Sequence, residues 1–206
     1  MYMPSHFDET RIDVLHALVA DHPLGTLVLN TPDGLCADHV PFEIGAATQD
    51  APFGVLRAHV ARANPVWQRA GLPVLAVFQG PSGYVSPGFY EEKAASGKVV
   101  PTWDYAVVHA HGTLQAIDDP VWLLALLERL TAHHEKASAR PWAVRDAPAE
   151  YIERLLRAIV GIEIPITRLH GKWKMSQNRP VQDQRNIAAG LPGSAMAALI
   201  AARLPG

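Results

Sequence analysis

Two runs of sequence decide the fold: Tyr84-Val85-Ser86-Pro87-Gly88-Phe89-Tyr90 and, after a polar loop, Val99-Val100-Pro101-Thr102-Trp103-Asp104-Tyr105-Ala106-Val107-Val108-His109-Ala110-His111-Gly112. The second run alternates in character, which predicts a β-strand with aromatic rings and then imidazoles on one face. Flat apolar walls with a few polar groups, here Ser86, Thr102 and Asp104, are typical of a ligand or cofactor pocket. A core strand beside a proline-rich turn explains the same pattern, so both interpretations stay open.

The composition is that of a globular chain. It has 206 residues, 49% of them hydrophobic, and a formal net charge of −2, which suits one large domain and lacks the basic excess of a nucleic-acid binder. The single cysteine, Cys36, excludes an intramolecular disulfide and suits a reducing compartment. Residues 1–11 lack the apolar segment of a secretory signal, and no apolar run is long enough to span a bilayer. We therefore expect a soluble, cytoplasmic protein.

Local patterns predict a helix, a series of strands, and then helices on both sides of a last strand. Helical spacing, alternation and turn residues carry these assignments, with Asp8 expected to cap the first helix and Thr31-Pro32-Asp33-Gly34 to form a hairpin turn. The expected helices are 8–21, 121–135, about 146–158, 180–190 and 194–204, and the expected strands are 24–30, 35–44, 53–61, 73–79, 102–117 and 162–168, with a turn at 81–83.

The order of these elements predicts the architecture. Strands do not alternate one-for-one with helices, which argues against a doubly wound parallel sheet, and no G-x-G-x-x-G or P-loop motif occurs. We predict an α+β, mainly β fold: an antiparallel barrel of about six strands with flanking helices. Residues 1–180 are expected to form this domain with inserted helices, and residues 181–206 a C-terminal helical extension.

Two groups of polar residues could hold a phosphate-bearing cofactor, because Arg and Lys match phosphate oxygens in charge and geometry. One group is His59, Arg62 and Asn64 at a strand end. The other is the run from Lys172 to Arg179, which combines three cations with three neutral polar residues. Asn64 could equally be a helix cap, and the second run could be a solvated β-turn.

Other chemistry finds less support. His109 and His111 share a strand face, as in some metal sites, but no Cys or acidic residue stands at ligand spacing beside them, so we expect no metal. No G-x-S-x-G, H-E-x-x-H or partnered cysteine indicates a hydrolase. We assign no catalytic residue.

Several segments, kept in order from residue 1 to about 185, resemble the PaiB family, described as FMN-binding negative transcriptional regulators. The chain departs from the family pattern at Asp104, where the family has Asn, and at Phe89 and Met175. The resembling segments are residues 1–7, His59-Val60-Ala61-Arg62-Ala63-Asn64-Pro65-Val66-Trp67, Tyr84-Val85-Ser86-Pro87, Val100-Pro101-Thr102-Trp103-Asp104-Tyr105, Val108-His109, Gly161-Ile162-Glu163-Ile164 and Gly171-Lys172-Trp173-Lys174-Met175-Ser176-Gln177-Asn178-Arg179.

The resemblance implies an FMN-binding split β-barrel, a six-stranded Greek-key barrel that forms a homodimer with flavin at the interface. It implies a cofactor site drawn from three kinds of residue. The phosphate candidates are Arg62, Lys172, Lys174 and Arg179, the ring or ribityl candidates are His59, Ser86, Thr102, Trp103 and Asp104, and Asn64, Ser176 and Gln177 complete the set.

For function, we expect a regulator that acts indirectly, through flavin, a metabolite or a protein partner. A DNA reader needs cations to neutralise phosphates, whereas 18 basic residues stand against 20 acidic ones and no expected helix has a basic face, so direct DNA binding is doubtful. Three alternatives stay open: an FMN-dependent oxidoreductase of pyridoxamine-phosphate-oxidase type, a haem-binding split barrel that uses His109 or His111, and a partner-binding module that has lost flavin.

Overall fold

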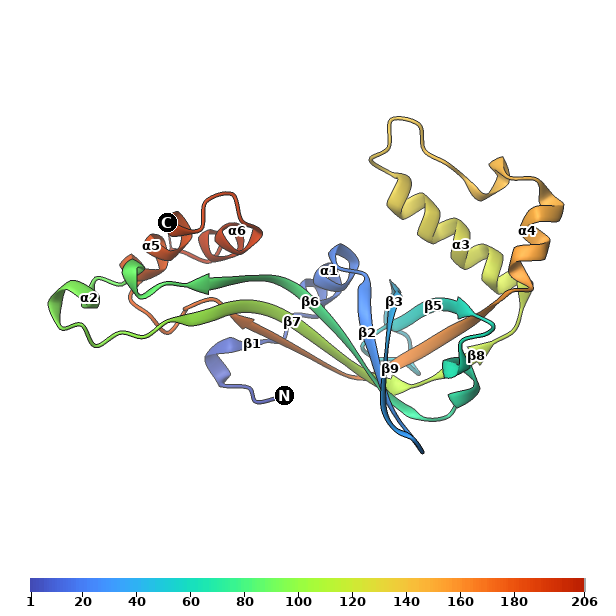
Figure 1. The fold of residues 1–206 in the computed structure, drawn as a ribbon, viewed down its shortest axis with the longest axis horizontal. Coiled ribbons are helices and arrows are strands. Elements are labelled where there is room, and N and C mark those ends of the chain that lie inside the picture. Colours follow the sequence, from blue (N-terminus) through green and yellow to red (C-terminus); the bar gives the residue numbers. More distant parts are fainter. Residues whose placement is uncertain (206) are drawn as a thin grey trace. The chain divides into compact units, whose positions relative to one another are not determined.

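A computed structural model describes residues 1–205 of the chain. The chain divides into two compact units, each assembled from separated stretches. The first unit contains Met1–Leu18, Phe78–Val108 and the described residues from His170 onward, and the second contains Val19–Val77 and His109–Leu169. Figure 1 shows α5 and α6 together in the first unit, and α3 beside α4 in the second.

The sheet determines the architecture. Its strands follow the order β3-β2-β6-β7-β9-β5-β4, and β1 and β8 also pair with β9. Three strands are short and six are long, which agrees with the six-stranded count expected from the sequence. The short strands are β1 Asp8–Glu9, β4 Glu43–Gly45 and β8 Gln115–Ile117, and the long ones are β2 Leu24–Thr31, β3 Gly34–Pro41, β5 Val55–Ala61, β6 Pro73–Val85, β7 Thr102–Thr113 and β9 Ile159–Lys174.

The α-helices lie between and after the strands, and all but α2 were predicted; α2 forms in the stretch that was expected to be a polar loop. They are α1 Ile12–Asp21, α2 Glu92–Ala95, α3 Pro120–Glu135, α4 Ala149–Leu156, α5 Val181–Gly190 and α6 Ala195–Ala201. Short 3₁₀ turns form at η1 Ser5–Phe7, η2 Pro65–Arg69, η3 Pro87–Phe89 and η4 Val144–Asp146. Among the described residues, no helix combines the length and the apolar character needed to cross a membrane.

The predicted hairpin of β2 and β3 is confirmed. The two strands pair antiparallel from Leu24↔Pro41 to Thr31↔Gly34. Gly34 has a φ of 110°, a conformation that glycine adopts without steric cost and that closes the turn. β2 buries Leu27 and Leu29, whereas most of β3 is exposed, so β3 is the outer strand of its pair.

Two expectations from proline and glycine residues were wrong. The turn predicted at 81–83 does not form, because β6 continues to Val85. Gly83 serves close packing instead: a Cβ there would lie 3.3 Å from the Leu191 side chain. The first helix begins at Ile12, and Asp8 does not cap it, because Asp8 pairs with Lys172 in β1.

The late strand is longer than the sequence predicted. β9 runs from Ile159 to Lys174, so the segment 171–174 is strand and not a solvated turn. A Cβ at Gly171 would lie 2.1 Å from the Leu15 side chain, which shows how closely α1 packs on this strand. The predicted strand 102–117 is interrupted at Leu114, whose backbone bonds to Gly71 and Leu72.

The first unit joins residues from near both ends of the described chain. The Glu9 carboxylate is 5% exposed and accepts hydrogen bonds from Arg11 and from Arg203 Nη2 at 2.6 Å. Hydrogen bonds from Arg11 lower the Glu9 pKa against the opposing effect of burial. Helices α5 and α6 occupy the stretch expected to be helical after residue 180, while the predicted domain boundary there stays a prediction.

Candidate functional site

The predicted site residues fall into two groups, one in each unit. His59, Arg62 and Asn64 belong to the second unit, at β5 and its exit. β5 places Ala58 and Val60 in the core, so by alternation Arg57 and His59 share the opposite face.

Arg62 is held by the protein itself. Its Nε donates to Arg157 O at 2.8 Å, its Nη1 and Nη2 donate to the two Asp118 oxygens at 2.9 and 2.6 Å, and its Nη2 also donates to Ile159 O at 3.0 Å. The hydrogen bonds to Asp118 raise the Arg62 pKa. A guanidinium has five N–H groups, so one remains for any ligand. Arg62 therefore ties the exit of β5 to the segments before α3 and β9.

Asn64 also has a structural role, as the capping alternative predicted. Its Oδ1 accepts from Val66 N at 2.9 Å at the start of η2, and its Nδ2 donates to Asp38 Oδ1 at 2.9 Å. A hollow of about 670 Å³ lies beside it, between the tip of the β2–β3 hairpin and η2. The exposed thiol of Cys36 lines this hollow.

His59 is different, because its buried Nδ1 has no hydrogen-bond partner among the described residues. Burial lowers the pKa of the imidazole, which favours the neutral form. The ring lines a hollow of about 330 Å³ together with Leu127, Leu130 and His134 of α3.

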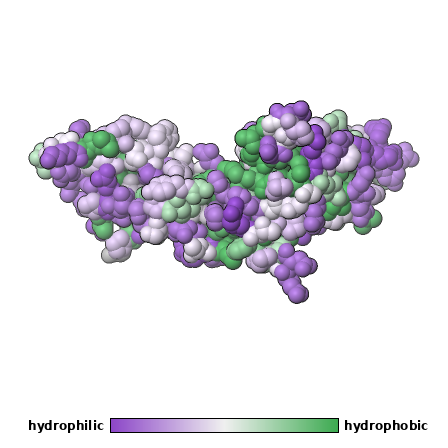
Figure 2. Space-filling model, turned by 90° about the horizontal axis from the view of Figure 1, so that it is seen from below, coloured by the Kyte–Doolittle hydropathy of each residue, from purple (hydrophilic) through white to green (hydrophobic). Residues whose placement is uncertain are grey.

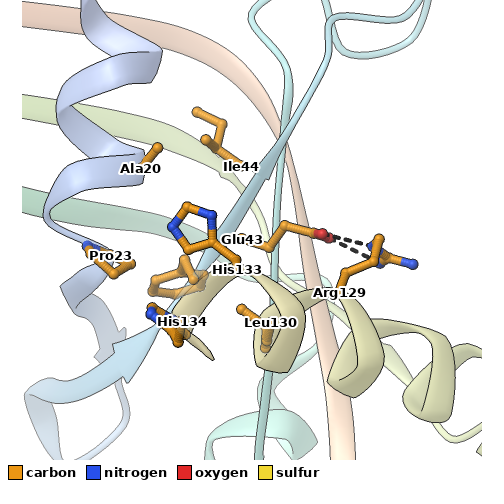
Figure 3. A pocket seen from close by; sticks show the side chains of 9 residues that line it. Ala20, Pro23, Glu43, Ile44, Arg129, Leu130, His133 and His134 are labelled. Atoms are coloured by element: carbon orange, nitrogen blue, oxygen red, sulfur yellow. Dashed lines mark hydrogen bonds and ion pairs between the residues drawn. The ribbon is translucent and has the colours of Figure 1, made fainter. Parts of the chain in front are cut away.

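Another hollow, of about 280 Å³, adjoins the hollow beside His59, since Leu130 and His134 line both. Figure 3 shows His133 and His134 of α3 beside Glu43, whose carboxylate points at Arg129. The Arg129 Nε and Nη2 donate to the two Glu43 oxygens at 2.6 and 2.9 Å. This ion pair links α3 to β4 and neutralises the Glu43 carboxylate, which lines the hollow.

The first unit brings five predicted site residues together. The Asp104 carboxylate is fully buried and accepts from Ser176 Oγ at 2.6 Å and from Lys174 Nζ at 3.2 Å. Lys174 Nζ also donates to Thr102 Oγ1 at 2.7 Å and to the Trp103 carbonyl. Sequence reasoning selected these residues but did not foresee that Lys174 and Asp104 form an ion pair.

The turn after β9 is fixed by its own side chains. Gln177 accepts from Met175 N at 2.7 Å and donates to the Trp173 carbonyl. Ser176 has a φ of 56°, which is the only left-handed conformation at a residue other than glycine in the described chain. Such a conformation is uncommon outside glycine and asparagine and marks a position constrained by its surroundings.

The remaining cations contact aromatic rings. Lys172 is 8% exposed, lies 5.5 Å from the centre of the Tyr105 ring and donates to Tyr2 O at 3.1 Å. The Arg179 guanidinium lies 4.6 Å from the centre of the Tyr90 ring. Burial raises the pKa of the Tyr90 phenol, and the charge of Arg179 partly opposes that shift.

An exposed aromatic pair flanks this cluster. Trp103 is 58% exposed and Tyr84 is 48% exposed, and their rings meet edge to face with centres 6.1 Å apart. On the face drawn in Figure 2, apolar surface gathers in green patches between polar areas. Ser86 begins η3, where its Oγ accepts from Gly88 N at 3.1 Å.

Sequence reasoning missed three residues. Neither Asp118 nor Asp183 was predicted as a site residue, and Tyr90 was quoted without a role. Asp183 is 4% exposed and accepts from Glu91 N at 3.0 Å, while the buried Tyr90 hydroxyl has no partner of good geometry in the described residues. Of these three residues, only Tyr90 could have been found from the neighbouring sequence, because it is an aromatic residue in the proline-rich stretch.

The histidines of β7 are not arranged as metal ligands. Within residues 1–205, no cluster of three His, Cys, Asp or Glu side chains could hold a metal ion. Arg168 Nη2 lies 3.1 Å from His111 Nδ1.

Solved structures with a similar fold bind flavin. The FAD and heme binding protein from Mycobacterium smegmatis matches with a TM-score of 0.58 and 18% identity, over 89% of this chain and 80% of that one. The flavocytochrome Anf3 from Azotobacter vinelandii matches with a TM-score of 0.59 and 12% identity, over 84% and 72%. These likenesses agree with the predicted fold: a mainly β, antiparallel split barrel with flanking helices.

Sequence comparison then gives the family. Residues 1–168 match the family model described as "Putative FMN-binding domain", and the chain belongs to this family. The protease synthase and sporulation protein PAI 2 of Bacillus subtilis is 30% identical over 91% of this chain and 87% of its own length. An uncharacterized protein of Emericella nidulans is 36% identical over 92% and 90%. The resemblance to the PaiB family is therefore confirmed.

The described residues fit a flavin in part. The exposed rings of Trp103 and Tyr84 provide apolar surface beside a rigid polar cluster in the first unit. Among the four phosphate candidates, Arg62 and Lys174 are engaged by the protein, whereas Arg179 has no ion pair with a carboxylate in the described chain. Which residues contact a flavin stays a prediction.

Proposed function

We propose that this protein binds FMN and regulates indirectly, by reporting a flavin or metabolite state to a partner. One observation carries the flavin assignment: a chain of an FMN-binding family presents an exposed aromatic pair beside a buried, strained polar cluster. An aromatic ring packs favourably on another ring in offset or edge-to-face geometry. Trp103 and Tyr84 are the residues we expect to contact the flavin ring.

When bound, flavin supplies hydride and single-electron chemistry. The residues of this chain would bind and orient it: Trp103 through ring contact, and Thr102 and Ser176 through hydroxyl groups fixed by Lys174 and Asp104. No side chain is assigned as a general acid or base, so oxidoreductase activity stays an alternative.

The absorption spectrum of the purified protein and a titration with FMN test the proposal. We expect saturable quenching of flavin fluorescence, and we expect Trp103→Ala to weaken binding. Trp142→Ala is the matched control, because Trp142 is another half-exposed tryptophan, in the second unit. Colourless protein that also fails to bind added FMN would contradict the proposal and support the alternative of a partner-binding module that has lost flavin.

The regulatory part of the proposal excludes direct operator binding. Acidic residues outnumber basic ones, 20 to 18, and three cations of the second unit, Arg57, Arg62 and Arg129, pair with acids. A gel shift at about 100 mM salt should show no sequence-specific complex, because phosphate contacts supply much of DNA affinity. A specific complex at nanomolar protein would contradict indirect action.

Two further parts of the proposal follow from the family. We propose a cytoplasmic homodimer with flavin at the subunit interface. Light scattering coupled to size exclusion, with and without FMN, would measure the mass, and a monomer at micromolar concentration in both conditions would contradict this arrangement.

A further inference from the structure

The four cations expected to hold a phosphate are not equivalent in the folded chain. Lys174 has three partners, namely Thr102 Oγ1, the Trp103 carbonyl and Asp104 Oδ1. An ammonium group has three donors, so Lys174 has none left for a ligand. A phosphate approaching it would also meet the negative charge of Asp104, which is fully buried and therefore poorly screened by solvent.

Lys172 and Arg62 are also limited. Lys172 is 8% exposed, and its charge faces the rings of Tyr2 and Tyr105. Arg62 keeps one N–H group after its four hydrogen bonds, and its charge is paired with Asp118.

Arg179 is half-buried and lacks a carboxylate within ion-pair distance among the described residues. Its guanidinium lies over the Tyr90 ring, 4.6 Å from the ring centre, and its N–H groups have no acid partner in the described chain. A planar guanidinium presented in this way suits bidentate contact with phosphate oxygens.

The backbone that carries Arg179 is held by hydrogen bonds, and Asp104 takes part in them. Arg179 N donates to Ser176 O at 2.8 Å, and Gln184 Nε2 donates to Arg179 O at 2.8 Å. Ser176 in turn donates its hydroxyl to Asp104 Oδ2 at 2.6 Å and is held with φ 56°. Asp104 therefore does two things: it fixes the turn that presents Arg179, and it occupies Lys174.

We infer that Arg179 holds the phosphate group of the flavin nucleotide and that Asp104 withholds Lys174 from it. The ligand class of this subsite is a phosphate monoester, and the inference rests on the proposed flavin function. Asp104 is then a specificity-determining residue, because it sets how many cations the phosphate can use.

The affinity ratio between FMN and riboflavin isolates the phosphate contact, since the two ligands differ only by that group. Arg179→Gln should lower FMN affinity roughly tenfold to hundredfold and leave riboflavin affinity unchanged. Arg185→Gln, which removes the same charge from an exposed position on α5, should change neither affinity. An unchanged ratio in Arg179→Gln would overturn the inference.

Two variants test the role of Asp104. Lys174→Met should leave the ratio unchanged, because the lysine has no free donor. Asp104→Asn keeps an oxygen that accepts from Ser176 but turns an amide toward Lys174, so it should release Lys174 and raise FMN affinity over riboflavin affinity by about tenfold. If Lys174→Met lost the preference for FMN over riboflavin, or if a folded Asp104→Asn did not gain FMN affinity over riboflavin affinity, the inference that Asp104 withholds Lys174 from the phosphate would be overturned. Near-ultraviolet circular dichroism establishes that Asp104→Asn is folded.

Inorganic phosphate separates this inference from the proposed function. If wild-type protein binds neither FMN nor riboflavin, the flavin proposal fails, and the thermal shift with phosphate decides the subsite alone. Stabilisation of wild type that disappears in Arg179→Gln and increases in Asp104→Asn supports the inference. A shift that is absent, or that does not depend on Arg179, overturns it.

Discussion

Gly112 is a position where a single methyl group should be costly, because its nearest neighbour is backbone. It lies in β7, against β9 within the second unit. A Cβ added there would lie 2.3 Å from the Pro165 carbonyl oxygen and 2.6 Å from Ile164 Cγ2, whereas ordinary contact begins at 3.4 Å. The nearest obstacle is backbone, which cannot rotate away as a side chain can, so the strands must separate by about an ångström to admit the methyl group.

The size of the effect follows from this geometry. Overpacking typically costs about 1–3 kcal/mol, and a backbone obstacle places Gly112→Ala near the upper figure. The reduced entropy of the unfolded chain returns about 0.4–1 kcal/mol. We therefore expect a net loss of about 2 kcal/mol, which lowers the Tm of a chain of this size by roughly 4–8 °C.

Differential scanning calorimetry on wild type, Gly112→Ala and a control measures this change. The control is Gly83→Ala, where the nearest atom is the end of the Leu191 side chain at 3.3 Å, so its Tm should fall by less than about 2 °C. Equal Tm values for wild type and Gly112→Ala would refute the reasoning, because they would mean that β7 and β9 can separate without cost.

Three further predictions concern charged and titratable groups of the second unit. Burial lowers the pKa of His59. As pH falls below about 6.5, the unfolded state therefore takes up a proton before the folded state does, and the stability present above that pH is lost toward the lower folded pKa. The Tm difference between pH 7.5 and pH 5.5 should be smaller in His59→Gln than in wild type, and an equal difference would contradict this. Arg62→Lys should lower the Tm, because an ammonium cannot reproduce the two-pronged contact with Asp118, and a variant as stable as wild type would show that the contact is dispensable. Glu43→Gln removes the charge facing Arg129, whose side chain is 47% exposed, so screening limits the loss to about 0.5–1 kcal/mol, or roughly 1–4 °C in Tm; a Tm that rises would refute the anchoring role of the pair.

Local signals predicted the elements whose stability is local. The β2–β3 turn was predictable because Gly34 adopts a conformation that few other residues accept, and the start of α3 because Asp119 caps it through Val121 N at 2.8 Å. The lengths of β6 and β9 were not predictable, because Gly83 and Gly171 admit side chains from distant segments and do not turn the chain.

The candidate site shows the same limit. Residue types and resemblance selected Asp104, Lys174 and Ser176, yet their chemistry depends on contacts that join residues 70 and 72 positions apart. Whether a cation is free for a ligand is a property of its folded neighbours. Sequence alone therefore gave Lys174 and Arg179 the same role, and the structure distinguishes them.

The Glu9–Arg203 contact has a consequence for synthesis of the chain. The two residues are 194 positions apart, so this ion pair of the first unit cannot form until Arg203 has been translated. The second unit draws only on residues 19–77 and 109–169, and all of its residues are available earlier. Chains generally fold by domains as they emerge, and long-range contacts form slowly. We therefore expect a truncated chain that ends at residue 190, and so lacks Arg203, to protect the second unit from protease while its N-terminal segment remains cleavable.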